Sequence, residues 1–237
     1  MKRVLVSWSS GKDSAWTLWV LRQRSDVEIV GLLTSFNQAV GRVAMHAVRR
    51  ELVERQALAA GLPLWCIQLP WACPNDVYEA RMREAVERAK RDGITHIAFG
   101  DLYLEDIRAY RERNLAGTGV DPLFPIWTTS SDTPRLAREM LAADLRAMIS
   151  CVDPKQLDGR FTGREFDDAL LADLPSQVDP CGERGEFHTF CWQGPMFSEP
   201  IPVRVPGVSF RDGFWFADLL PREAKPALHA LDAARRS

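Results

Sequence analysis

The sequence predicts an α/β fold, in which a parallel sheet carries helices on both faces, followed by a smaller α+β domain at the C-terminus. Strand-like and helical segments alternate along the first half of the chain in the order β-α-β-α-β-α-β-α. Polar clusters follow three of these strands, at the edge where parallel sheets bind ligands. The second half is rich in proline and loops. We therefore expect one domain at residues 1–128 and another at residues 129–237.

The strands of the first half are short apolar runs bounded by polar or turn-forming residues. Each is separated from the next by a helical segment, which favours parallel pairing because parallel strands need a long crossover connection. We expect these strands at Arg3–Trp8, Val27–Leu33, Leu64–Leu69 and Thr95–Phe99.

The helices between the strands place apolar side chains at every third or fourth position. The first is expected at Asp13–Gln23. The second runs from Met45 past Ala59 and ends at Gly61, a residue type that commonly terminates helices. The third and fourth are expected at Asp76–Arg91 and Glu105–Leu115.

The second half begins after the Thr/Ser run Thr128–Asp132. A helix is expected at Pro134–Ala147, and the segments that follow are short and separated by prolines. We expect strands at Met148–Val152, Glu186–Cys191, Ile201–Val205 and Val208–Phe216, and a terminal helix or frayed end at Pro226–Arg236.

Composition restricts the class of protein. Hydrophobic residues make up 46% of the 237 residues and charged residues 26%, which is typical of a globular protein and argues against disorder. A net charge of −2 provides no general attraction to nucleic acid or anionic lipid. No apolar run approaches the roughly 20 residues that span a bilayer, so we expect no membrane association and a cytoplasmic location. Five cysteines without a C-x-x-C pair predict neither a disulfide framework nor a structural zinc site.

The segment Ser-Ser-Gly-Lys-Asp-Ser, residues 9–14, follows the first strand and opens the first helix. Amide groups at a helix N-terminus attract anions, and Gly11 allows close backbone approach to a ligand. Lys12 adds a positive charge, while Asp13 is suited to hold a cation. The spacing matches neither the Walker loop nor the G-x-G-x-x-G loop. The alternative is a helix capped by Ser9 or Ser10.

Two interpretations are open for several other polar residues. Asp101 either caps the helix after the fourth strand or binds Mg²⁺ or ribose at the sheet edge. Arg108 and Glu112 form either a surface ion pair or a binding site. His46 either packs or binds substrate. Glu183, Glu186 and His188 are either solvated loop residues or parts of a site, and the last view is favoured by their clustering.

Residues 9–14 resemble the PP-loop of ATP pyrophosphatases, usually Ser-Gly-Gly-x-Asp-Ser, with Ser10 in place of a glycine. If that position needs a positive φ, serine costs about 1 kcal/mol there. Further matches are to the diphthine–ammonia ligase family. They comprise His46-x-x-Arg49-x-x-Leu52-x-x-x-Gln56-Ala57, Gly100-Asp101-Leu102, Pro122–Trp127, Val152-Asp153, Leu157-Asp158, Gly163-Arg164, Phe166-Asp167 and the Cys181–Thr189 signature with Gly194–Phe197.

The resemblance implies a Rossmann-like (HUP-type) sheet and an ATP-dependent ligase. A carboxylate would be activated as an acyl-adenylate, with ATP converted to AMP and pyrophosphate, and then amidated by ammonia. The implied cofactors are ATP and Mg²⁺. The carboxylate acceptor in the family's reaction is diphthine on elongation factor 2. Alternatives are an ATP pyrophosphatase acting on a tRNA base or small carboxylic acid, and a non-catalytic adenine-nucleotide sensor. The oligomeric state is not predicted.

The same resemblance assigns expected roles to residues. The catalytic set is Lys12, Asp13, Asp101, Glu186 and His188, with Asp13 and Asp101 as Mg²⁺ ligands. The ATP-binding set is Ser9, Ser10, Gly11, Lys12, Asp13, Ser14, Leu33 and Thr34. The substrate-binding set is His46, Arg108, Glu112, Arg113, Cys181, Gly182, Glu183, Gly185 and Glu186.

Overall fold

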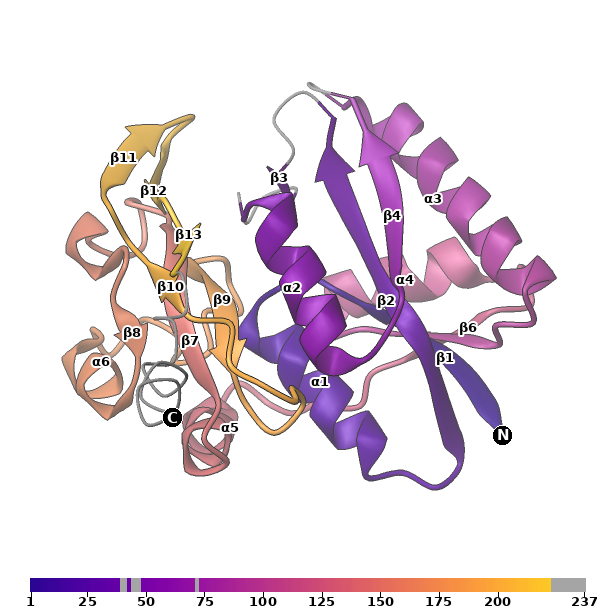
Figure 1. The fold of residues 1–237 in the computed structure, drawn as a ribbon, viewed down its shortest axis with the longest axis horizontal. Helices are drawn as coiled ribbons and strands as arrows, with labels where there is room; N and C mark the ends of the chain where they lie inside the picture. Colours follow the sequence, from indigo (N-terminus) through magenta and orange to yellow (C-terminus); the bar gives the residue numbers. More distant parts are fainter. Residues whose placement is uncertain (39–41, 44–47, 71–72, 223–237) are drawn as a thin grey trace, which may run out of the picture.

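The computed structural model describes residues 1–38, 42–43, 48–70 and 73–222. Its first unit alternates strands and helices, as Figure 1 shows. The elements are β1 (Lys2–Ser7), α1 (Lys12–Arg22), β2 (Val27–Asn37), β3 (Arg42–Val43), α2 (Arg50–Ala60), β4 (Leu64–Leu69), α3 (Asn75–Arg91), β5 (His96–Ala98), α4 (Glu105–Leu115) and β6 (Asp121–Leu123).

The first sheet is parallel, with the strand order β4-β2-β1-β5-β6, and the short β3 pairs antiparallel with the end of β2. The chain begins at β1, builds outward through β2 and β4, and then returns to add β5 and β6 on the other side. The strand order therefore reverses between β1 and β5. A crevice for ligands is expected at the carboxyl ends of these two strands. The predicted Rossmann-like parallel sheet is confirmed.

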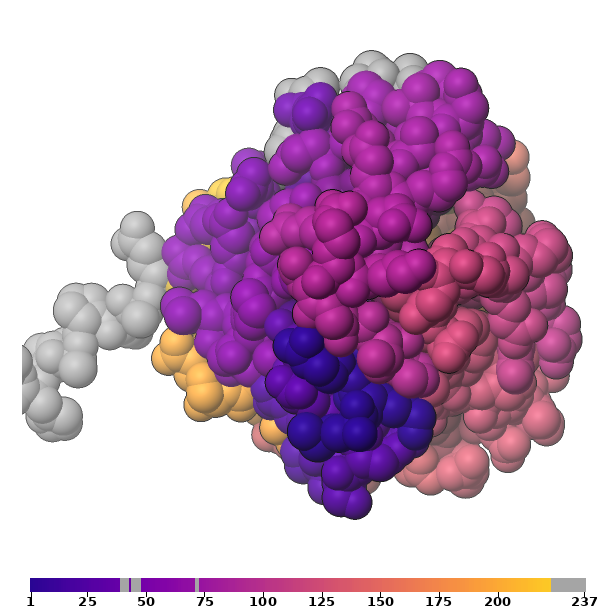
Figure 2. Space-filling model, turned by 90° about the vertical axis from the view of Figure 1, so that its right-hand side faces the viewer, coloured from indigo at the N-terminus to yellow at the C-terminus, as the bar shows by residue number. Residues whose placement is uncertain are grey.

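Helices cover both faces of this sheet because successive strand residues point to opposite sides. Val4 and Val6 face α1 and α2 in one hydrophobic cluster. Leu5 and Ile97 face the opposite way and pack in a second cluster, to which α3 contributes Val86. Figure 2 shows the side of the molecule that α3 covers, with the first strand (indigo) below it.

Within the described residues, the second unit has an antiparallel sheet and the helices α5 and α6, which confirms the predicted α+β domain. Strand β7 lies at its centre and pairs with β8, β9 and β12, while β10 and β13 form a separate pair. The elements are α5 (Thr133–Ala142), β7 (Arg146–Val152), the 3₁₀ turn η1 (Gly159–Phe161), β8 (Glu165–Phe166), α6 (Asp168–Asp173), β9 (Phe187–Gln193), β10 (Val203–Arg204), β11 (Val208–Arg211), β12 (Phe214–Ala217) and β13 (Leu220–Pro221).

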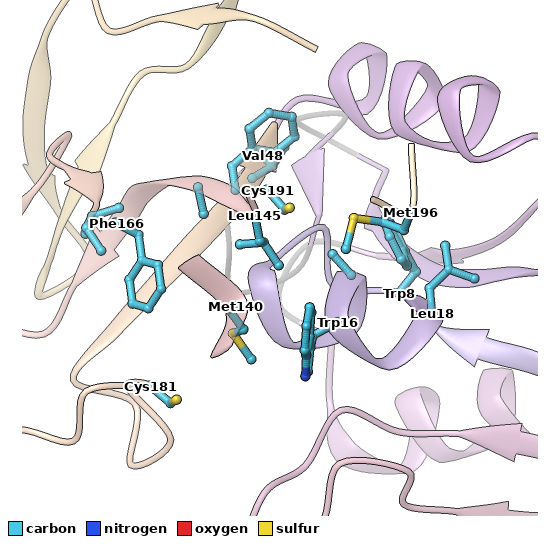
Figure 3. Packing of buried hydrophobic residues seen from close by; sticks show 14 of the residues in the cluster. Trp8, Trp16, Leu18, Val48, Met140, Leu145, Phe166, Cys181, Cys191 and Met196 are labelled. Carbon is cyan, nitrogen blue, oxygen red and sulfur yellow. The ribbon is translucent and has the colours of Figure 1, made fainter. Parts of the chain in front are cut away.

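The two units share one hydrophobic core. The cluster that contains Trp8 and Leu18 of the first unit continues without interruption into Phe166 and Met196 of the second. Figure 3 shows Trp8, Leu18 and Met196 close to one another and Phe166 farther away, beside the second unit. Helix α1 lies between the two sheets in Figure 1. The N-terminus of α1 is therefore enclosed by both units.

Some predicted boundaries differ from the structure. Helix α5 ends at Ala142 rather than Ala147, because Asp144 adopts a left-handed backbone with φ of 60° and starts the turn into β7. The strand expected at Val208–Phe216 is a hairpin that turns at Asp212, where φ is 50°. Helix α2 begins at Arg50. Met45 and Pro226–Arg236 lie outside the described residues.

In the ranges that the structure describes, no helix has the length and apolarity needed to cross a bilayer.

Candidate functional site

Residues 8–11 form a tight loop between β1 and α1. Ser10 adopts a left-handed backbone with φ of 70°, so this position does need a positive φ. Serine costs about 1–2 kcal/mol in this conformation, whereas glycine adopts it freely. The Ser10 hydroxyl is buried and has no hydrogen-bond partner among the residues that the structure describes. Its loop therefore stores strain at the point where the helix begins.

The first turn of α1 is surrounded by serine hydroxyls. Gly11, not Ser9 or Ser10, is the N-cap residue of the helix. The Gly11 amide donates to Ser9 Oγ at 3.3 Å, and Ser9 Oγ lies 3.2 Å from Ser14 Oγ. Ser14 Oγ in turn donates to the Gly11 carbonyl oxygen at 3.0 Å. These donors bond to one another within the loop, and an anion at the helix N-terminus would replace their present acceptors.

A cavity of about 710 Å³ opens at the carboxyl ends of β1, β2 and β5, between α3 and α4. This volume is within the range of small-molecule sites. Three predicted ATP-binding residues line it, namely Ser9, Leu33 and Thr34. The buried Thr34 hydroxyl has no partner among the described residues, so it can bond a ligand. Its other lining residues include Tyr78 and Met82 of α3 and Tyr110, Arg111 and Arg113 of α4.

The Lys12 side chain points away from this cavity and into the second unit. Its ammonium group lies 2.8 Å from Asp13 Oδ2, donates to the Cys181 carbonyl oxygen, and sits 5.5 Å and 5.7 Å from the ring centres of Phe166 and Phe187. Burial is the largest effect on the pKa of Lys12 and lowers it, but Asp13, Cys181 and Glu183 together outweigh that effect and the net pKa is raised. Lys12 therefore stays charged and joins the loop to the second unit.

Asp101 lies beside the start of α1. A Cβ atom on the preceding Gly100 would be only 3.0 Å from the Asp13 carbonyl carbon, so the two backbones are in contact. Arg111 donates to Asp101 Oδ2 at 3.2 Å and packs 4.9 Å from the ring centre of Phe99. Sequence reasoning missed Arg111, although it lies one helical turn after Arg108.

The predicted α4 residues lie in different places. Arg108 pairs with Glu112 at 2.9 Å on the surface and covers the rings of Phe124 and Trp127. These contacts agree with the interpretation of Arg108 and Glu112 as a surface ion pair. Arg113 lines the cavity. His46 lies outside the described residues.

The C-terminal segment Cys181–Thr189 packs directly against the loop. The Lys12 amide donates to Thr189 Oγ1 at 3.0 Å, and the Cys191 amide donates to the Ser10 carbonyl oxygen at 2.9 Å. Gly182 has a φ of 71°, and a Cβ atom there would lie 2.8 Å from the Phe187 carbonyl oxygen. No other residue type fits this turn without a shift of the backbone.

The acidic residues of this segment bond to backbone amides. Glu183 accepts from the Leu102 amide at 2.7 Å. Burial raises the pKa of Glu183 to about 8, the Leu102 amide opposes this, and the charges of Asp13 and Asp101 add to it. Glu186 is buried and accepts from the amides of Asp179 and Arg184, at 2.9 Å each.

His188 and Gly185 complete the predicted set. Burial lowers the pKa of His188 to about 4, with a further contribution from the Lys12 charge, so the imidazole is neutral near pH 7. The Gly185 amide donates to the Gly182 carbonyl oxygen at 3.1 Å and closes the turn.

Mg²⁺ is the metal that the sequence predicts at this site. No group of three or more His, Cys, Asp or Glu side chains in the described part of the chain is arranged to hold a metal. Mg²⁺ bound with nucleotides needs only one or two carboxylates, because phosphates and water supply the rest. Asp13 and Asp101 are carboxylates of this kind, and each accepts from a basic side chain, Asp13 from Lys12 Nζ at 2.8 Å and Asp101 from Arg111 Nε at 3.2 Å. The chemistry of the two carboxylates, rather than a preformed group of ligands, is what suits a nucleotide-bound Mg²⁺.

Comparisons with known proteins point to one family. A family model of the diphthamide synthase N-terminal domain matches residues 1–122, and one of the diphthamide synthase C-terminal domain matches residues 132–219. The human diphthine–ammonia ligase is 26% identical over 224 residues, covering 85% of this chain and 82% of the human protein. The rat diphthine–ammonia ligase is 25% identical over the same extent.

Proposed function

The chain belongs to the diphthamide synthase family, and from this membership we propose that it is an ATP-dependent ligase of the diphthine–ammonia ligase type. A carboxylate oxygen of the acceptor attacks the α-phosphorus of ATP, and the bond from that phosphorus to the pyrophosphate oxygen breaks. Ammonia then attacks the acyl carbon of the adenylate. The C–O bond to AMP breaks, a proton is released, and an amide remains. The proposed acceptor is diphthine on elongation factor 2.

The observation that carries this proposal is the contact between the PP-loop and the Cys181–Thr189 segment. Both segments carry family motifs, and they lie about 170 residues apart in sequence. An adenylating enzyme must hold a carboxylate next to the α-phosphate, and such positioning supplies a large part of the rate enhancement. The contact supports a site to which the first unit contributes ATP and the second the acceptor.

We assign the phosphates of ATP to the backbone and hydroxyls of residues 9–14. Donors fixed before the reaction stabilise the charge that develops on the leaving pyrophosphate. The adenine lies in the cavity against Leu33 and Thr34, whose hydroxyl would gain a partner. Asp13 and Asp101 would hold Mg²⁺, which neutralises phosphate charge when bound. Lys12 acts on this site through Asp13, since its ammonium is directed toward Cys181.

The acceptor would meet the turn Gly182–Gly185, with Glu183 and Glu186 as its acidic groups. Glu183 lies in the negative field of Asp13 and Asp101, which suits binding of ammonium or of a cationic part of the acceptor. His188, in the same segment, is the group that we assign to take up the proton released by the attacking ammonia.

The products of turnover test the proposal. ATP, ammonium and a panel of carboxylate acceptors, including diphthine-bearing elongation factor 2, are incubated with the protein. We expect AMP and pyrophosphate in equal amounts, released only with an accepted carboxylate, and an amide product by mass spectrometry. ADP and phosphate as main products would contradict the family chemistry. AMP formation with a different carboxylate alone would keep the chemistry and change the acceptor.

A further inference from the structure

The amide side chain of Gln56 connects three segments around the PP-loop. It projects from α2 and is fully buried. Its Nε2 atom donates to the Ser10 carbonyl oxygen at 3.0 Å and to the Cys191 carbonyl oxygen at 2.6 Å. Its Oε1 atom accepts from the indole Nε1 of Trp8 at 2.9 Å. Every hydrogen of the Gln56 amide group is thus used, and the oxygen has a donor.

The bond to the Ser10 carbonyl fixes a strained peptide group. Ser10 has a φ of 70°, a conformation that serine adopts only when its surroundings enforce it. Its carbonyl oxygen receives two hydrogen bonds, one from Gln56 and one from the Cys191 amide. The Cys191 backbone is itself bonded to Gln56 through its carbonyl. These hydrogen bonds connect the loop, α2 and β9 to one another.

The direction of this carbonyl sets the direction of the next amide. A trans peptide group is planar, so the carbonyl of Ser10 and the amide of Gly11 point in opposite directions. Because Gln56 holds the carbonyl on the α2 side, the Gly11 amide points into the loop, where Ser9 Oγ lies 3.3 Å away. Among residues 9–14, Ser9 lines the cavity, so the Gly11 amide points toward a residue of the cavity wall.

We propose that Gln56 is a positioning residue that keeps the Ser10–Gly11 peptide turned so that the Gly11 amide faces the phosphates of ATP. The inference rests on the proposed function, since it presumes that the loop binds ATP. Gln56 itself does not touch the nucleotide. It acts through the Ser10 carbonyl, and its contribution depends on the strain at Ser10.

The test pairs Gln56→Met with Ser10→Gly. Methionine keeps the length of the side chain but removes the hydrogen bonds, and glycine adopts a positive φ without strain. Isothermal calorimetry measures the Kd of ATP, and steady-state pyrophosphate release gives KM and kcat. We expect Gln56→Met to weaken ATP binding about tenfold, the equivalent of one or two hydrogen bonds. The Kd of Ser10→Gly alone is measured first and serves as the reference for the double variant, because glycine also removes the Ser10 hydroxyl.

The double variant decides between positioning and general destabilisation. With Ser10→Gly present, the loop holds its conformation without Gln56, so Gln56→Met should then change the Kd by less than about threefold. Leu52→Ala is the matched control, because Leu52 is also fully buried on α2 yet belongs to the core. It should lower Tm without changing the Kd of ATP.

Each result has a defined meaning. Normal ATP binding by Gln56→Met, or a full tenfold loss in the double variant, would overturn the inference. If Gln56→Met alone does not fold, the double variant is compared with Ser10→Gly, and near-equal Kd values support the inference while unequal values overturn it. Absence of ATP binding by the unaltered chain would instead overturn the proposed function, and the inference with it.

Discussion

At the scale of the single residue, the Lys12–Asp13 pair links stability to catalysis. The Lys12 side chain is 1% exposed and that of Asp13 26%, so Asp13→Asn leaves a buried ammonium whose acceptors, including the Cys181 carbonyl, are all neutral. We expect Asp13→Asn to abolish turnover and to lower the free energy of unfolding by about 2–3 kcal/mol, less than for a fully buried pair because Asp13 is partly solvated.

Urea unfolding followed by circular dichroism measures this loss. Lys12→Met combined with Asp13→Asn should be more stable than Asp13→Asn alone, because it removes the unpaired charge. Equal stability of the single and double variants would show that the pair is not coupled.

Glu183 makes stability depend on pH. Its pKa in the folded protein is about 8, above the ordinary 4.5, so the folded state holds a proton that the unfolded state has lost. The contribution of Glu183 to the free energy of unfolding is fully present below pH 4.5 and is lost as the pH rises through about 8. His188 acts oppositely, since its pKa falls from 6.5 to about 4. The contribution of His188 to the free energy of unfolding is therefore fully present above pH 6.5 and constant there.

Of these two groups, only Glu183 makes the free energy of unfolding change with pH between pH 6.5 and 8. We expect Tm to fall over this range, and Glu183→Gln to remove most of the slope because glutamine stays neutral and still accepts from the Leu102 amide. Differential scanning calorimetry at several pH values checks this. An unchanged slope in Glu183→Gln would mean that another group titrates there.

At the scale of the element, the end of α2 depends on a left-handed glycine. Gly61 has a φ of 64°, and a Cβ atom there would meet no heavy atom within 4 Å. Gly61→Ala therefore adds backbone strain without a clash, and should lower the free energy of unfolding by about 1 kcal/mol. Gly207 is equally open and lacks a positive φ, so Gly207→Ala is the control and should be near neutral. Urea titration measures both, and equal values would contradict the argument from φ.

Sequence patterns predicted the elements that carry their own local signal. Leu64–Leu69 and Glu105–Leu115 have the bounds that were expected, because apolar periodicity and the flanking residues define them. The two-residue strands β3 and β8 were not predicted, since they exist only through pairing with β2 and β7. Tertiary contacts, rather than propensity, determine such elements.

The candidate site also combines features that local sequence predicts with features that only tertiary contacts determine. The position of residues 9–14 after the first strand predicted where the loop lies. The direction of Lys12 was not predictable, because it depends on the Cys181 carbonyl, 169 residues away. Gln56 was matched only as part of a motif, and its role at Ser10 appears once α2 is packed on the loop. Long-range hydrogen bonds of this kind leave no spacing pattern in the sequence.

At the scale of the whole molecule, the two units should unfold together. The main core passes from Trp8 and Leu18 through Phe166 into Met196 without a break. Further bonds cross between the units, including Arg22 to the Met196 carbonyl at 2.7 Å and Arg49 to Asp218 at 2.7 Å. Separation of the units would expose apolar surface on both. We therefore expect one cooperative transition.

Hydrogen exchange with mass spectrometry at increasing urea resolves the two units, since peptides from β1 and β9 report on each. Their protection should be lost at the same urea concentration. ATP with Mg²⁺, at about 100 times its Kd, should raise the free energy of unfolding by about 2.7 kcal/mol, and because the core is shared it should shift both midpoints equally. A shift of the β1 peptides alone, or loss of β9 protection at lower urea, would show that the units are energetically separate and that their contact at Lys12 does not transmit nucleotide binding.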